Sequence, residues 1–87
     1  MYNHEHYREV PEKILNSLDN WAKKGWEGGS FLMACLENDL ARAVGHADEE
    51  NREALPGITK YMYNELPLSC WGSPENVVQW ANNIEEE

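Results

Sequence analysis

Basic residues are scarce in this chain of 87 residues: seven Lys and Arg stand against sixteen Asp and Glu, a formal net charge of −9. Nucleic-acid binding through phosphate contacts needs clustered Lys and Arg, so this composition argues against direct nucleic-acid recognition. The imbalance is strongest in residues 48–87, where Arg52 and Lys60 are the only bases. The length itself allows one small domain and no large internal cavity.

Long apolar runs are also missing. No stretch approaches the roughly 18–20 apolar residues that a membrane-spanning helix needs, and residues 1–9 lack the basic and apolar regions of a signal peptide. We therefore expect a cytosolic protein without a membrane partner. Only two cysteines are present, Cys35 and Cys70, and in the cytosol we expect both to be reduced and packed.

Two-residue alternation of apolar side chains is absent, which argues against a sheet, whereas helical spacing recurs four times. It predicts a first helix from Pro11 to Gly25 and a second from Ser30 to Ala47. A third helix is expected over residues 48–66, with a kink or a restart at Pro56, and a fourth over residues 73–84.

These elements predict an all-α, four-helix bundle-like single domain over residues 10–87, preceded by a flexible arm over residues 1–9. The arm contains His4 and His6, but two histidines without a Cys pair or an HExxH frame are weak evidence for zinc. We expect no metal and no cofactor.

Asp39 falls inside the apolar stripe of the second predicted helix. An unpaired buried carboxylate costs several kcal/mol, so donors should reach it, and Tyr63 or the turn at Trp71 is expected to supply them. Asp39, Trp71 and Tyr63 are thus the candidate buried polar anchor. A polar track along the same helix would consist of Cys35, Asp39, Arg42 and His46.

Four tryptophans need positions in so small a fold. Trp21 and Trp80 are expected in the core, and Trp71 should plug the end of the bundle. Trp26 lies in a Gly-rich loop and should be partly exposed, as aromatic residues at protein interfaces are. Together with Glu49, Glu50 and Glu53 it is the candidate interaction site. The alternatives are that Trp26 only covers the first helix and that the acidic face only aids solubility.

Several motifs cover residues 30–80: FLxAxLxNDL at 31–40, ADxxN at 47–51, YxYNxxP at 61–67 and CWGS at 70–73, followed by Trp80. In these motifs the chain resembles a group of small accessory proteins of phages, prophages and plasmids that have no established activity. The resemblance implies a mobile-element origin and supplies no catalytic residues.

Small acidic phage proteins frequently bind and inhibit host proteins, and some present carboxylates in place of DNA phosphates. By this analogy we expect a non-enzymatic protein-interaction factor in the host bacterial cytosol, an inhibitor or DNA mimic directed at a host defence or nucleic-acid-binding protein. The alternatives are a small-ligand or nucleotide-binding protein and a small hydrolase centred on Asp39. A homodimer is also left open.

Overall fold

The computed structural model describes residues 4–86, and the side chains of residues 4–84. Within this range the chain forms helices and no strand, which confirms the all-α class. There are five α-helices and two 3-10 helices: η1 (His4–His6), α1 (Glu12–Lys24), α2 (Ser30–Leu36), α3 (Leu40–His46), α4 (Glu49–Glu65), η2 (Leu68–Cys70) and α5 (Pro74–Glu86). None of the described helices is long and apolar enough to cross a membrane.

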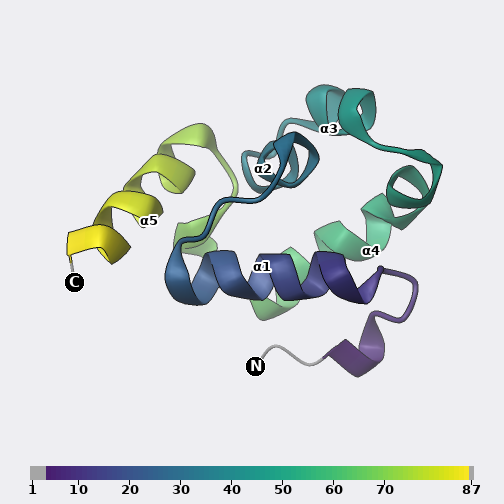
Figure 1. Ribbon diagram of the computed structural model, residues 1–87, viewed down its shortest axis with the longest axis horizontal. Helices are drawn as coiled ribbons and strands as arrows, with labels where there is room; N and C mark the ends of the chain where they lie inside the picture. Colours follow the sequence, from purple (N-terminus) through teal and green to yellow (C-terminus); the bar gives the residue numbers. More distant parts are fainter. Residues whose placement is uncertain (1–3, 87) are drawn as a thin grey trace.

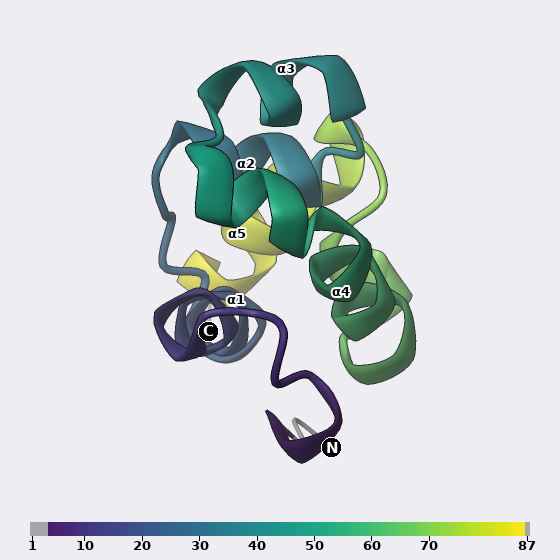
Figure 2. The same cartoon turned by 90° about the vertical axis from the view of Figure 1, so that its right-hand side faces the viewer.

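The helices are arranged around α2, which lies between α3 and α1 (Figure 1). In the same view α4 passes behind α1, and α5 lies at the opposite end from the start of α4. Turned by 90°, the molecule shows α1 nearly end-on with α4 beside it, and the N-terminal residues pass beneath both helices (Figure 2). The fold therefore brings the start of the chain against its middle.

α1 forms because its apolar residues repeat at helical spacing and its end is well capped. Its buried apolar side chains form one stripe: Ile14, Leu15, Leu18, Trp21 and Ala22. Gly25 adopts a left-handed conformation with φ of 70°, and its N–H donates to the carbonyl of Trp21 at 2.9 Å. Glycine favours this conformation because it has no Cβ. The expected end of the first helix is confirmed.

The continuous second helix expected over residues 30–47 is wrong, because the chain breaks between α2 and α3. Asn38 has φ of 62°, its N–H donates to the carbonyl of Cys35, and the Asp39 N–H donates to the carbonyl of Ala34. This bonding pattern is a Schellman motif, in which a left-handed residue ends a helix. Asp39 then caps α3, since its side chain accepts a hydrogen bond from the Arg42 N–H.

The later helices begin where the sequence predicts. Asp48 accepts a hydrogen bond from the Asn51 N–H at 2.8 Å and caps α4, and Ser73 accepts one from the Asn76 N–H at 3.1 Å and caps α5. α4 continues through the exposed Pro56, so the helix does not restart there. The third and fourth expected helices thus correspond to α4 and α5.

Trp21 is fully buried at the centre of the core and joins three parts of the chain. Its indole N–H donates to the carbonyl of Cys70 at 2.8 Å, and the Trp80 indole N–H donates to the carbonyl of Trp21 at 3.2 Å. Trp71 is buried at the turn before α5, as expected, whereas Trp80 is only partly buried. These bonds attach η2 and α5 to α1.

The N-terminal segment, defined here as residues 4–10, packs against the helices, so the expectation of a loose arm is wrong for the described residues. Tyr7 and Val10 are each only 3% exposed and belong to the core. Apolar burial of two such side chains is strongly favourable, because each gains roughly 1.5–3 kcal/mol on leaving water. Residues 1–3 of the expected arm lie outside the described residues.

Two glycine substitutions should change stability in opposite directions. A Cβ added at Gly57 would lie 2.6 Å from Glu9 Oε1 and 2.8 Å from Val10 Cγ2, whereas one at Gly45 would meet nothing within 4 Å. Gly45→Ala should raise the free energy of unfolding by roughly 0.5–1 kcal/mol, because alanine is the better helix former.

Gly57→Ala should lower the free energy of unfolding by roughly 1 kcal/mol. Alanine stabilises the helix here as well, but the cost of overpacking against Val10 is larger than this stabilisation. Urea denaturation of both variants beside the wild type measures the difference. Equal stabilisation by the two substitutions would contradict the packing of the N-terminal segment on α4.

Candidate functional site

Asp39 is not the buried anchor expected from the sequence. Its side chain is 42% exposed, and the interruption between α2 and α3 places it at a helix start instead of inside an apolar stripe. Its described partners both belong to Arg42: the backbone N–H at 3.2 Å and the guanidinium Nη1 at 3.5 Å. Arg42 also donates to Glu37 at 2.8 Å. The carboxylate is therefore a partly solvated helix cap.

The other two members of the expected anchor do not join Asp39. Tyr63 is 72% exposed on α4, so its expected burial is wrong. Trp71 is buried, but its indole N–H has no hydrogen-bond partner among the described residues. The polar track is interrupted as well, because Cys35 lies on α2 whereas Arg42 and His46 lie on α3. The three anchor residues thus form no common site.

The buried carboxylate of this fold is Asp19 on α1, which sequence reasoning missed. Asp19 is 8% exposed, and its Oδ1 accepts a short hydrogen bond from the hydroxyl of Tyr61 on α4. Its Oδ2 faces Nε2 of His4 at 2.7 Å. Asp19 lies between Leu18 and Trp21 in the chain, inside the buried stripe of α1, and this position was the available signal.

His4 is held between two carboxylates of α1. Its Nδ1 lies 2.8 Å from Glu12 Oε1, and its Nε2 contacts Asp19. Hydrogen bonding to Glu12, with further contributions from Asp19 that outweigh desolvation, raises the pKa of His4 above its usual value. Compared with a histidine in water, the imidazolium state, in which both nitrogens donate, therefore persists to higher pH.

Aromatic contacts complete this arrangement, named here the His4–Asp19–Tyr61 cluster after its three hydrogen-bonded members. The Tyr61 ring meets the Tyr7 ring edge-on with centroids 4.8 Å apart, and the His4 ring at 5.7 Å. Tyr7 donates to Glu65 at 3.0 Å, and burial raises the pKa of Tyr7. The cluster consequently ties the N-terminal segment to α1 and α4 through charge-assisted hydrogen bonds.

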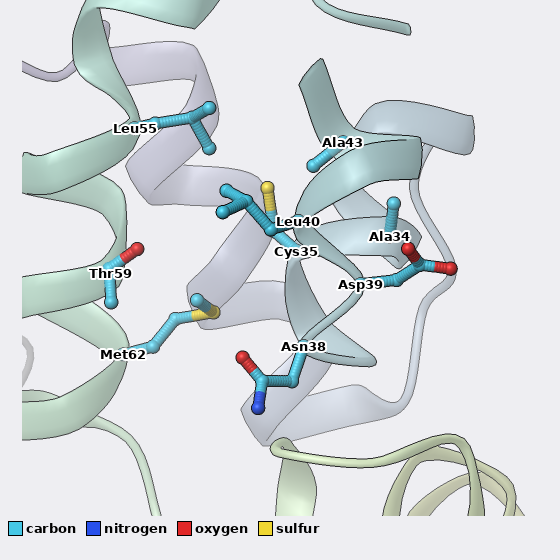
Figure 3. Close-up of a pocket in the computed structure, with 9 residues that line it drawn as sticks. All are labelled: Ala34, Cys35, Asn38, Asp39, Leu40, Ala43, Leu55, Thr59 and Met62. Carbon is cyan, nitrogen blue, oxygen red and sulfur yellow. The ribbon is translucent and has the colours of Figure 1, made fainter. Parts of the chain in front are cut away.

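A small cleft opens between α2, α3 and α4, with a volume of about 40 Å³. Figure 3 shows the Asp39 carboxylate pointing away from the α4 wall of this cleft. Drug-sized ligands occupy pockets of roughly 300–1,000 Å³, so this cleft is far too small for a nucleotide. It is lined mainly by apolar side chains, among them Cys35, Leu40, Ala43, Leu55 and Met62.

The acidic residues expected to bind a partner are exposed at the start of α4. Asp48, Glu49, Glu50 and Glu53 all face solvent, and the one base among them, Arg52, contacts the carbonyl of Ala47 at 3.4 Å. Carboxylates are favourable at a helix N-terminus because the helix dipole is positive there. This stretch, residues 48–53, is called the acidic turn below.

Trp26 is 57% exposed, as expected. The Lys24 ammonium sits 4.3 Å from the centre of its ring. A hollow lined by Trp26, Ser17 and Gly28 adjoins a second one of about 280 Å³, since both share Ser17 and Gly28. Asn51 of the acidic turn lines the second hollow. Trp26 and Asn51 thus line neighbouring hollows on the same face of α1.

Among the described residues, no group of three or more His, Cys, Asp or Glu is arranged to hold a metal ion. His4 makes hydrogen bonds to Glu12 and to Asp19. The described part of the chain therefore supplies no observation in favour of a metal centre.

Removing Asp19 should destabilise the fold more than removing Asp39. Asp19→Ala removes the acceptor of the buried Tyr61 hydroxyl bond and one of the two acceptors of the His4 ring, and the loss of such a buried bond costs roughly 1–3 kcal/mol. Asp39→Ala removes only an exposed helix cap, worth about 1 kcal/mol. Thermal and urea unfolding of the two variants test this order. A larger loss for Asp39→Ala would mean that the buried carboxylate has been misidentified.

Both cysteines should react slowly in the native protein. They are free and buried, and burial raises the pKa of Cys35 and of Cys70 to about 11 each. Because the thiolate is the reactive form, only about one thiol in a thousand is active at pH 8. Labelling followed by intact mass should give almost no early product in buffer and two additions in denaturant. Rapid labelling of the native protein would contradict the burial of the thiols, and an absence of labelling in denaturant would contradict their being free.

Comparison of this chain with family models, with curated proteins and with solved structures gives no match in any of the three. The resemblance to phage and plasmid proteins stays a prediction.

Proposed function

We propose that this protein is a non-enzymatic acidic interaction factor of mobile-element origin, which binds a basic surface of a host defence or nucleic-acid-binding protein and inhibits it. The observation that carries the proposal is an arrangement in which the exposed Trp26 and Asn51 of the acidic turn line two neighbouring hollows that share Ser17 and Gly28. It combines an aromatic anchor with unbalanced negative charge, and both features suit a basic partner surface.

The electrostatic part of this argument depends on how the carboxylates of α4 are placed. Glu49, Glu50 and Glu53 are exposed, and the formal charge of the whole chain is −9. Such a field accelerates encounter with a positively charged partner and disfavours nucleic acid itself. A DNA mimic would use the same carboxylates in the place of phosphates.

The hydrophobic part depends on Trp26. An exposed tryptophan beside a hollow can insert or be covered when a partner binds, and truncation of such residues commonly costs more than 1 kcal/mol of binding free energy. Lys24 stacks on the ring in the free protein and would exchange this contact for the partner. Trp26 is thus the proposed anchor, and the acidic turn provides orientation.

The alternative functions have less support in the geometry. The cleft beside Asp39 has a volume of about 40 Å³, and the Asp39 carboxylate is engaged by Arg42. A nucleotide-binding protein or a hydrolase centred on Asp39 would need a larger cavity or a second polar group converging on that carboxylate.

Charge-matched variants test the proposal. The acidic-turn variant carries Glu49→Gln, Glu50→Gln and Glu53→Gln. The control variant carries Glu85→Gln, Glu86→Gln and Glu87→Gln, so that both variants lose the same amount of negative charge. Each is compared with the wild type by quantitative affinity capture from a bacterial lysate, followed by association kinetics with the captured partner.

We expect the acidic-turn variant to associate roughly tenfold more slowly at low salt and the control variant to stay near the wild type. The difference should shrink at physiological ionic strength, where the Debye length is about 8 Å. Binding could also be independent of salt and of these substitutions but be lost in Trp26→Ala. That result would assign recognition to the aromatic anchor alone. Binding unchanged by all of them would overturn the proposed surface.

A further inference from the structure

The N-terminal segment is fastened to the helices mainly at its two ends. At one end His4 contacts Glu12 and Asp19 of α1, at 2.8 and 2.7 Å. At the other end Val10 packs against Gly57 of α4, where an added Cβ would lie 2.8 Å from its methyl carbon. Between them the Tyr7 ring lies against Tyr61. The segment therefore bridges α1 and α4, as its path beneath both helices in Figure 2 shows.

The two carboxylate contacts of His4 require a proton on both of its ring nitrogens. A carboxylate only accepts hydrogen bonds, and each ring nitrogen of His4 faces one: Glu12 at Nδ1 and Asp19 at Nε2. A neutral imidazole has a single N–H, so it can serve only one of them. The other contact would then set a ring lone pair against a carboxylate oxygen. Both contacts are satisfied only by the imidazolium ion.

We propose that the N-terminal segment is a pH-sensitive latch, which is closed on α1 and α4 while His4 carries two ring protons and is released when His4 loses one. The released state would uncover Tyr61, which is fully buried in the closed state, and would withdraw Tyr7 and Val10 from the core. It would also move Glu9 away from α4. In the closed state Glu9 lies over Gly57, which is one helical turn after Glu53.

The charged and titratable groups that face the latch explain why protonation of His4 closes it. From α1 the His4 ring meets Glu12 and Asp19, and from α4 it meets the Tyr61 ring. The Tyr7 hydroxyl bonds to Glu65, and the Lys60 ammonium lies 6.0 Å from the Tyr7 ring. The two carboxylates thus favour the cation, and their contribution outweighs the opposing effect of burial.

The pH dependence follows from linkage. The pKa of His4 is raised in the closed state by its hydrogen bonds to Glu12 and Asp19, while a detached histidine titrates near about 6.5. The proton therefore stabilises the closed latch fully below about pH 6.5, and this contribution is lost as the pH rises through the raised value. Between the two pKa values the closed-to-open ratio falls by up to about tenfold per pH unit.

Hydrogen exchange of the full chain tests the latch. The Tyr7 N–H donates to the carbonyl of His4 and the Val10 N–H to that of Tyr7, both at 3.0 Å. Protection factors of these two amides, measured by NMR from pH 5.5 to 9 and corrected for intrinsic rates, should fall as the pH rises through the raised pKa of His4, by up to about tenfold per pH unit. The Leu18 amide in α1 serves as internal reference. Protection of Tyr7 and Val10 that follows Leu18 at every pH would overturn the proposal.

Three variants separate the latch from general stability. His4→Gln cannot carry the charge and should show weak protection of Tyr7 and Val10 that no longer depends on pH. His6→Gln, at the exposed neighbouring histidine, is the matched control and should behave as the wild type. Glu12→Gln alters an exposed side chain of α1 and should lower the pH at which protection is lost, since Glu12 makes the largest contribution to the raised pKa.

Ring ¹⁵N shifts keep the proposal falsifiable even if His4→Gln does not fold. In the wild type His4 should titrate above its own value in the urea-unfolded chain, with both ring nitrogens protonated in the closed state. A His4 that titrates at the same pH in the folded and unfolded chain, or Glu12→Gln without effect on the pH of release, would overturn the latch.

Discussion

A buried carboxylate on α1 decides how three parts of this chain meet. Asp19 lies within an apolar stripe, where an unpaired charge is unfavourable by several kcal/mol. Tyr61 and His4 supply the hydrogen bonds that compensate for this cost, and they come from α4 and from the start of the chain. The position of the N-terminal segment is therefore a consequence of where one acid is buried. Tyr7 and Val10 of the same segment add apolar contacts with the core.

Trp21 has a comparable role on the other side of α1. Its indole N–H needs an acceptor inside the core and finds the carbonyl of Cys70, while its own carbonyl accepts from Trp80. α1 thus carries one polar link to α4 and the N-terminal segment and another to η2 and α5. The first turn of α4 lies outside the core, and its carboxylates remain exposed.

The interruption between α2 and α3 shows how two residues can redirect a helix with strong apolar periodicity. Asn38 tolerates the left-handed conformation, and Asp39 is a good helix cap, so the pair ends one helix and starts another. Phe31, Cys35 and Ala43 are buried, whereas Leu40 and Val44 of α3 are exposed. Periodicity thus predicted the buried face of α2 but missed the break in the backbone and the exposure of these two side chains in α3.

Apart from the break between α2 and α3, the helix boundaries and much of the core were readable from the sequence, because caps, glycine and apolar spacing act locally. Asp48, Ser73 and Gly25 mark boundaries in the places expected. The exposure of Trp26 and of the acidic turn also followed from their loop and charge context. The burial of Asp19 and the docking of His4 did not, because their partners are as far as 42 residues away in the chain. Local patterns determine which helices form, whereas only the packing of α1 against α4 decides which carboxylate is buried and which residues must satisfy it.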